Sequence, residues 1–325
     1  MSLGYTRSQE HNNDLVKFFA FEYTCDKMLL KTFCLRQMLA TTTSHRRSGD
    51  TELQYSKSNQ MQKDIYGSPR VLSMNQNYFN LIKAFSLTDF KLKYQSSILG
   101  YFWSLLNPLL TFGVFYVVFA LFVRFDILYY NIYLLLGIIF WNYFSEATQN
   151  SMAALVEKGR IIKNIYFPRT IVVIAANLTT FLGLVLNLVV FLVFFLFSGI
   201  SVSITVLFFV VYLLLLFFLT LGFSFVLAAL NLKYRDVQHL WRIAIQILFW
   251  ATPVVYPLKM VPQHLQKIFL FNPFFLIIDG ARSLLIYKKP IVFSELLLAI
   301  VYTCFIFFVG YIIYRKMSEK FPEWI

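Results

Sequence analysis

The sequence predicts an all-α integral membrane protein with six transmembrane helices. Of the 325 residues, 58% are hydrophobic and only 14% are charged, whereas about 25% of the residues in soluble globular proteins are charged. Residues 170–232 contain no Asp, Glu, Lys or Arg. Because about 20 apolar residues form a helix long enough to cross a bilayer, this stretch is expected to cross the membrane twice.

Residues 1–73 form a polar segment unlike the rest of the chain. They are rich in Ser, Thr, Gln, Asn and mixed charge, and charged residues interrupt their short apolar pieces. No crossing and no signal peptide is expected here. The segment is either a disordered or loosely helical cytoplasmic tail or not native, with translation starting at Met74. The predicted six-helix transmembrane domain therefore covers residues 74–325.

An amphipathic pattern precedes the first predicted crossing. Between residues 78 and 94, apolar residues recur near helical spacing with charged residues between them. This pattern predicts an N-terminal helix lying in the membrane interface, although a simple flank of the first crossing fits it equally well. The residues assigned to this interface helix are Phe85, Asp89, Phe90, Lys91 and Tyr94.

Six apolar segments are then assigned as membrane crossings. They cover residues 100–123, 131–151, 170–197, 203–231, 240–258 and 293–314. The fifth is the weakest, because its charge-free part is short and contains Pro253, which kinks or breaks a helix.

Lys and Arg residues predict the orientation of the chain. The formal net charge is +13, and the basic residues lie mostly at the ends of apolar runs, so they indicate topology rather than nucleic-acid binding. Their clusters place both termini in the cytoplasm.

The segment 259–289 conflicts with the positive-inside rule, because it puts five basic residues outside. Its apolar middle is short and contains Pro273, so we expect re-entrant helices in the outer leaflet, with an ordinary extracellular loop as the alternative.

The sequence contains no motif for catalysis or nucleotide binding. It lacks a Gly-x-x-x-x-Gly-Lys-Ser/Thr phosphate loop, and its three cysteines and four histidines lack metal-ligand spacing. Few ionisable residues fall within the crossings, and each exception (Glu146, Arg242 and Glu295) lies toward the end of its predicted crossing. We therefore expect no metal or cofactor in this chain, and any energy for transport has to come from another subunit.

A polar insert, EKGRIIKNIYFPR (residues 157–169), separates the second and third crossings. Its basic residues surround an apolar pair, a pattern that fits a short amphipathic helix docking into a groove of a soluble partner. A solvated loop that fixes topology by its positive charge is the alternative. The candidate coupling residues are Arg160, Ile162, Lys163, Phe167, Pro168 and Arg169.

Six sequence stretches occur in the order and spacing of a known family. They are LTDFKLKYQSSILGYFWSLLNPLL (87–110), YLLLGIIFWNYFSEA (133–147), IIKNIYFPR (161–169), NLKYRDVQHLW (231–241), ATPVVYPL (251–258) and FNPFFLIIDGARSLL (271–285). From about residue 74 onward, the chain resembles the permease of type-2 ABC exporters that move polysaccharides, such as O-antigen, capsule and teichoic acid exporters.

This resemblance implies a homodimer in the bacterial inner membrane, with two separate ATPase subunits that bind ATP and Mg²⁺. It implies that residues 157–169 form the coupling helix and that Arg235 and Asp236 belong to the second cytoplasmic loop. It also implies that residues 262–285 fold back into the membrane and help to gate the outer exit. The candidate gate residues are Asn272, Pro273 and Arg282.

The substrate class also has a physical rationale. Sugar rings present apolar faces that pack on aromatic side chains, and 19% of the residues here are aromatic. Most of these residues are expected to face lipid, pack in the core or anchor helix ends at the interface. The candidates for the translocation pathway are Trp103, Tyr116, Trp141, Tyr143, Trp250 and Tyr256.

The leading interpretation is a permease subunit that carries lipid-linked polysaccharide outward, driven by ATP hydrolysis on a partner chain. The alternatives are a permease for a small lipid or drug, an integral membrane glycan-processing enzyme and a scaffold protein. An enzyme would need clustered Asp, His or Arg residues at a membrane face, and the sequence shows no such cluster.

Overall fold

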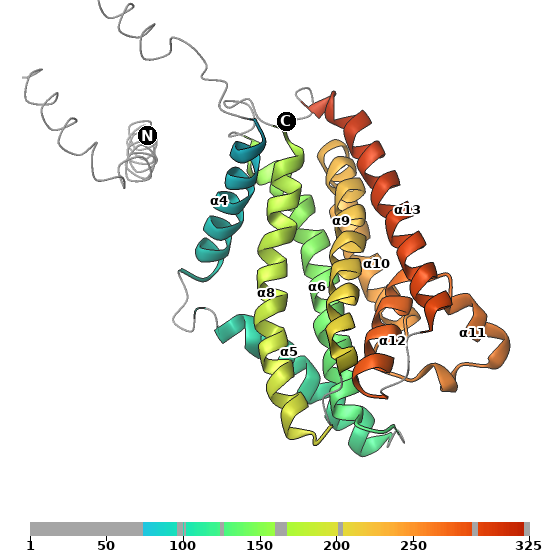
Figure 1. The fold of residues 1–325 in the computed structure, drawn as a ribbon. Helices are drawn as coiled ribbons and strands as arrows, with labels where there is room; N and C mark the ends of the chain where they lie inside the picture. Colours follow the sequence, from blue (N-terminus) through green and yellow to red (C-terminus); the bar gives the residue numbers. More distant parts are fainter. Residues whose placement is uncertain are drawn as a thin grey trace, which may run out of the picture. The chain divides into compact units, whose positions relative to one another are not determined.

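The computed structural model describes residues 74–95, 100, 102–123, 127–159, 168–200, 204–287 and 292–321. Every regular element in these ranges is helical (Figure 1). The elements are α4 (Met74–Gln95), α5 (Phe102–Tyr116), the π-helical η1 (Val117–Phe122), α6 (Tyr130–Glu157), α8 (Thr170–Phe197), η2 (Ile204–Phe208), α9 (Phe209–Lys233), α10 (Val237–Ala251), η3 (Leu258–Met260), α11 (Gln263–Phe269), α12 (Pro273–Leu285) and α13 (Phe293–Ser318). The predicted extension, residues 1–73, lies outside the described part.

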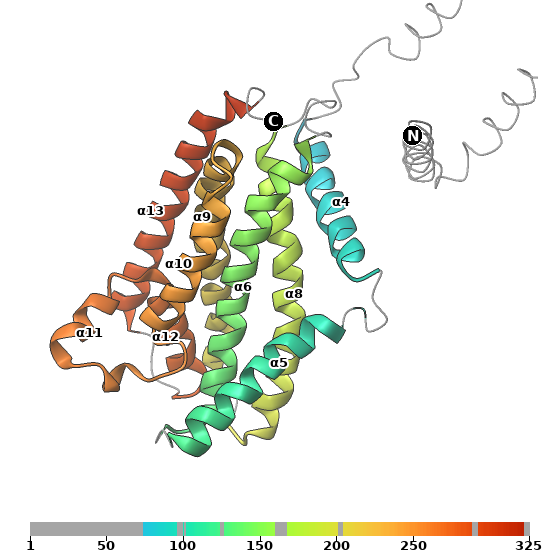
Figure 2. The same ribbon diagram turned by 180° about the vertical axis from the view of Figure 1, so that it is seen from behind.

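The central helix of the bundle is α6, which packs against both α8 and α9 (Figures 1 and 2). Most of its residues are buried, including the polar Thr148 and Ser151. A helix surrounded by protein needs no uniformly apolar surface, because its neighbours shield its polar side chains from lipid. This explains why α6 continues to Glu157, beyond the predicted end at residue 151.

The end of α6 lies beyond the predicted crossing 131–151. The sequence places Glu146 toward the end of that crossing, and this depth in the membrane stays a prediction. Glu146 precedes the last residue of α6, Glu157, by about three turns, or about 16 Å along the helix axis.

Within the described residues, four helical stretches are long and apolar enough to cross a membrane, so the chain is a multi-pass membrane protein. They are Ser104–Phe122, Thr170–Phe197, Val206–Lys233 and Phe293–Ser318. α6 has 28 residues but is more polar, and α10 has only 15, which gives it a length of about 22 Å against a hydrocarbon core of about 30 Å. Each predicted crossing overlaps a helix, but a total of six crossings stays a prediction.

The weakest predicted crossing, residues 240–258, is not one continuous helix. α10 ends at Ala251, and the backbone is extended at Thr252 (φ −107°, ψ 136°), as the residue before Pro253 prefers. The following helices, α11 and α12, are bent by 100° relative to each other, the geometry of a broken span or a re-entrant loop. They occupy the segment for which the sequence predicts re-entrant helices.

Two further contacts complete the bundle. α9 and α13 approach so closely that a Cβ atom at Gly310 would lie 2.3 Å from the carbonyl oxygen of Gly222. α4, which contains the predicted interface segment 78–94, packs against α8 at the end of the bundle where α8 begins (Figure 1).

Candidate functional site

The turn that follows α10 is fastened to the central helix by two tyrosines. The hydroxyl of Tyr130 donates a hydrogen bond to the carbonyl oxygen of Val255 (3.1 Å), and the hydroxyl of Tyr133 donates to that of Tyr256 (3.1 Å). Both tyrosines are buried in the first turn of α6. The hydroxyls thereby satisfy carbonyl groups that a helix would otherwise have paired.

Arg282 on α12 also binds this turn. Its side chain is fully buried, and its guanidinium donates to the carbonyl oxygens of Pro253 (3.0 Å), Tyr133 (3.0 Å) and Val254. It also lies 3.5 Å from the centroid of the Tyr133 ring. Carbonyl dipoles and the ring face offset the cost of burying a charge, so Arg282 joins α6, the turn and α12.

Gly137 makes room for this guanidinium. A Cβ atom at position 137 would lie 2.2 Å from Nη2 of Arg282 and 2.7 Å from the carbonyl oxygen of Val254. Sequence analysis assigns no role to Gly137, although a glycine within the apolar run YLLLGII signals a close approach.

Asn272 and Pro273 form the start of α12. The Asn272 side chain accepts hydrogen bonds from the backbone N–H groups of Phe274 (3.1 Å) and Phe275 (3.3 Å), and its amide donates to the Thr252 hydroxyl (3.0 Å). Pro273 occupies the first helical turn, where a missing N–H costs nothing. The three candidate gate residues, Asn272, Pro273 and Arg282, therefore converge on the turn at residues 252–256.

An aromatic pocket of about 350 Å³ lies beside this turn. Its lining includes Trp141 and Phe144 from α6, Phe223 from α9, and Phe271 and Phe274 around the start of α12. Trp141 is buried and makes an edge contact with Phe274, with ring centroids 5.2 Å apart. Of the six predicted pathway aromatics, Trp141 is the one that lines this pocket.

The other predicted pathway aromatics have different surroundings. Tyr143 is buried and donates to Asn177 (2.8 Å), which donates to Ser224 (3.0 Å), so it belongs to a polar chain linking α6, α8 and α9. Trp250 is 56% exposed, and its carbonyl oxygen accepts a hydrogen bond from the Tyr256 hydroxyl (2.9 Å). Tyr116 is partly exposed, with 36% of its surface accessible to solvent. The side chain of Trp103 lies outside the described part.

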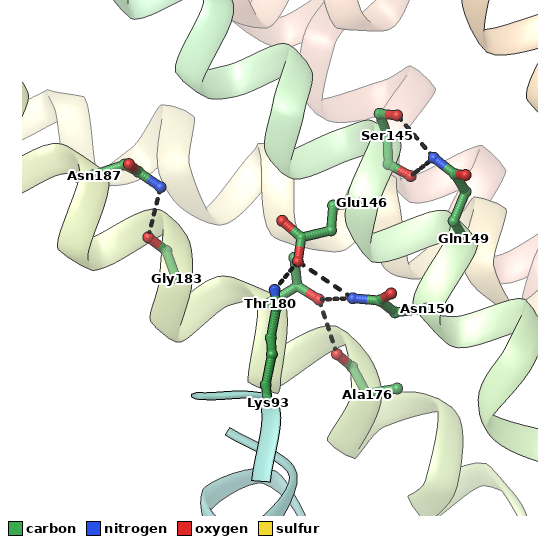
Figure 3. Close-up of polar contacts among 9 residues, drawn as sticks. All are labelled: Lys93, Ser145, Glu146, Gln149, Asn150, Ala176, Thr180, Gly183 and Asn187. Atoms are coloured by element: carbon green, nitrogen blue, oxygen red, sulfur yellow. Dashed lines mark hydrogen bonds and ion pairs between the residues drawn. The ribbon is translucent and has the colours of Figure 1, made fainter. Parts of the chain in front are cut away.

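A polar cluster lies between α4, α6 and α8, as Figure 3 shows. Lys93, near the end of α4, forms an ion pair with Glu146 on α6. Asn150, one turn further along α6, donates to the Thr180 hydroxyl of α8 (3.1 Å) and weakly to Glu146 (3.4 Å). The cluster borders a cavity of about 440 Å³, which sequence analysis did not predict because its residues come from segments far apart in the chain.

α4 is further tethered near the C-terminal end of α6. Asp89 pairs with Lys158, whose ammonium group also lies 5.0 Å from the centroid of the Phe85 ring. Thr179 of α8 donates to the carbonyl oxygen of Ser86 (3.2 Å). Among the other predicted interface-helix residues, Phe90 is half-buried, Lys91 is exposed and the Tyr94 side chain lies outside the described part.

Most of the predicted coupling residues cannot be placed. Arg160, Ile162, Lys163 and Phe167 lie outside the described residues, whereas Pro168 is exposed directly before α8. Arg169 donates a hydrogen bond to the carbonyl oxygen of Ser318 and lies 5.9 Å from the centroid of the Phe321 ring. It thus connects the start of α8 to the end of α13.

The predicted second cytoplasmic loop is a short turn between α9 and α10. Arg235 and Asp236 are both exposed there. This turn lies at the same end of the bundle as the end of α6 and the start of α8 (Figure 1).

Comparisons with known proteins give a consistent result. A family model described as "ABC-2 type transporter" matches residues 80–286. An O-antigen export system permease protein RfbA of Klebsiella pneumoniae is 28% identical over 247 residues, which cover 75% of this chain and 95% of that protein. The protein of the same name from Myxococcus xanthus is 27% identical over 215 residues, which cover 66% of this chain and 77% of that protein.

Proposed function

Because the chain belongs to the ABC-2 type transporter family, we propose that it is the permease subunit of an ATP-driven exporter of O-antigen-like, lipid-linked polysaccharide. The bacterial inner membrane is the proposed location. Relatives named as O-antigen export permeases support the substrate class, since the similarity covers nearly the full length of one of them. The observation that carries the proposal is the aromatic pocket beside the turn at residues 252–256. Aromatic faces pack against the apolar faces of sugar rings, and they do so without a strongly binding charged group.

ATP hydrolysis belongs to separate ATPase subunits in this proposal, which bind ATP and Mg²⁺. The sequence contains no phosphate loop. The end of α6 and the start of α8, which flank the predicted coupling segment, lie at the same end of the bundle as the turn with Arg235 and Asp236. This end is the proposed cytoplasmic face and the docking surface for the ATPase.

The exposed polar residues on the surface of α10 support a homodimer. Only Ile245 of this helix is buried, while Arg242 and Gln246 are exposed. Such polar side chains are costly against lipid, and a second copy or an aqueous pathway between two copies removes that cost. α5 adjoins the same surface, since Phe115 stacks on Phe249 of α10 with ring centroids 5.6 Å apart.

The proposed outer gate consists of the bent pair α11–α12 and the turn at residues 252–256. Arg282, Asn272 and two tyrosines of α6 fix the turn, while α11 has no buried residue. Few buried contacts allow local movement at small cost. We therefore propose that α11 moves relative to a fixed turn when the exit opens.

Expression with the cognate ATPase in a strain that lacks its own O-antigen permease tests the proposal. Surface polysaccharide should return. Phe271→Ala should lower it by about threefold to tenfold, because an aromatic contact with a sugar is lost, while Phe271→Trp should retain it. The matched control is Phe197→Ala, since Phe271 and Phe197 are similarly exposed (74% and 87%) but only Phe271 lines the aromatic pocket.

Two outcomes would count against this proposal. Export of a small lipid or drug without surface polysaccharide would favour the alternative permease function. Equal polysaccharide levels in the Phe271→Ala and Phe197→Ala strains, with equal insertion, would remove the aromatic pocket from the pathway.

A further inference from the structure

A second cavity lies away from the aromatic pocket and has a polar lining. It is formed by the end of α4, the start of α5 and the middle parts of α6 and α8, with a volume of about 440 Å³. The side chains that matter below are Asn107, Asn142, Tyr143, Glu146, Thr180 and Lys93.

Two amides in this cavity lack a partner in the described part of the chain. They are the side-chain amides of Asn107 and Asn142. Asn107 lies in the candidate membrane span Ser104–Phe122, and Thr180 across the cavity lies in the candidate span Thr170–Phe197. Polar groups between membrane-spanning helices are costly unless protein, water or a polar ligand satisfies them. The cavity is therefore built to hold a polar occupant.

A neighbouring cavity of about 370 Å³ continues toward the inner end of α6. The two share Lys93, and the second adds Asp89, Glu157 and Lys158 to the lining. Together they present a polar track from the inner end of α6 to the middle of the bundle.

The charges along this track select the class of ligand. Both ammonium groups, those of Lys93 and Lys158, are already paired with carboxylates, and Glu157 adds a further negative charge to the lining. A phosphate or another anion would meet net repulsion. Amides, hydroxyls and a tyrosine ring instead match an uncharged group with several hydroxyls and an apolar face.

We propose that this cavity binds an uncharged sugar ring presented from the membrane on the side of α4. The amides of Asn107 and Asn142 donate to its hydroxyls, and Glu146 accepts from them. That the ring belongs to the exported glycan rests on the proposed function, whereas binding itself does not.

The test uses cysteine accessibility in lipid nanodiscs. Gly183→Cys is introduced into the full chain with Cys25, Cys34 and Cys304 changed to Ser, because Gly183 lines the cavity and a Cβ atom there meets nothing within 4 Å. The rate of its modification by a small neutral water-soluble thiol reagent is measured. The discs contain phosphatidylethanolamine alone, or with a diacylglycerol that carries one glucose, or with phosphatidylglycerol. Because polar groups line the cavity, the introduced thiol should react, and the glucosyl lipid should slow the reaction about tenfold, whereas phosphatidylglycerol should leave it unchanged.

The matched control is Gln149→Cys on α6. Among the described residues, the Gln149 amide bonds only to the carbonyl and hydroxyl oxygens of Ser145, and Gln149 does not line the cavity, so the glucosyl lipid should not protect a thiol there. Adding Glu146→Gln to Gly183→Cys should reduce the protection at position 183, since a strong hydrogen-bond acceptor is lost.

Several results would overturn the inference. They are an unreactive thiol at position 183, no protection of it by the glucosyl lipid, equal protection by phosphatidylglycerol, or equal protection of the thiol at position 149. The assay needs neither ATPase nor transport, so a negative result leaves the proposed export function standing. A failure of export in cells likewise leaves the binding result intact.

Discussion

Arg282 illustrates how a single buried charge organises this protein. Its planar guanidinium contacts carbonyl oxygens from α6 and from the turn after α10, and it covers the Tyr133 ring. A lysine at this position would present a single ammonium group in place of the planar set of N–H donors, so it would not reproduce these contacts. The family resemblance predicts Arg282 as a gate residue, and the structure shows that its guanidinium binds backbone carbonyl oxygens.

A substitution at Gly137 tests this arrangement. Gly137→Ala places a Cβ atom within 2.2 Å of the guanidinium, so Arg282 must move away from its carbonyl partners. We expect a loss of about 1–3 kcal/mol in the free energy of unfolding, measured by thermal unfolding in detergent. The matched control is Gly113→Ala in α5, where nothing lies within 4 Å of the added atom and the change should be neutral or stabilising. Equal stability of the two variants would contradict this role of Gly137.

α4 is attached to the bundle by polar contacts rather than by an apolar face alone. Its contacts with α6 are the Lys93–Glu146 and Asp89–Lys158 ion pairs, and its contact with α8 includes a hydrogen bond to the Ser86 carbonyl. Lys158 belongs to the predicted coupling segment, residues 157–169. We therefore expect movement of that segment to act on α4 through the Asp89–Lys158 pair.

A charge exchange tests the tether. Asp89→Lys places like charges together and should lower export by about threefold to tenfold at normal insertion, because a partly buried pair contributes about 1 kcal/mol. Adding Lys158→Asp should restore export. Lys91→Asp, a charge change at an exposed position of the same helix, serves as the control. If Asp89→Lys exports normally, or if the double variant remains as defective as the single one, the tether has no part in transport.

The sequence predicts the positions of the long helices well, because runs without charged residues end where helices end. The predicted crossing 170–197 has the same bounds as α8. α6 extends to Glu157, six residues beyond the predicted crossing 131–151, and most of this helix is buried in protein, so its polar residues give no signal of membrane depth.

The sites are less predictable than the helices. Resemblance to a family identifies Asn272, Pro273 and Arg282, but not their partner Gly137. The sugar cavity depends on the relative depth of Lys93, Asn142 and Thr180 on three different helices. Helix periodicity does not contain that information, because it describes each helix by itself.

The orientation of the chain is testable at two described positions. Ser198, at the end of α8, and Arg235, in the turn after α9, lie at opposite ends of the bundle. In a chain whose native cysteines are changed to Ser, an impermeant thiol reagent added outside the cell should label Ser198→Cys but not Arg235→Cys, as the positive-inside rule predicts. Labelling of the Arg235→Cys variant alone would reverse the proposed topology.

ATP-driven transport by purified components tests the proposed function most directly. The chain and its cognate ATPase are reconstituted into liposomes loaded with lipid-linked O-antigen, and polysaccharide transferred across the bilayer is measured with Mg²⁺ and ATP. We expect transfer only when both proteins and ATP are present, and no ATP hydrolysis by this chain alone. Transfer without the ATPase, ATP hydrolysis by the isolated chain, or hydrolysis by the complex without any polysaccharide transfer would contradict the proposed function.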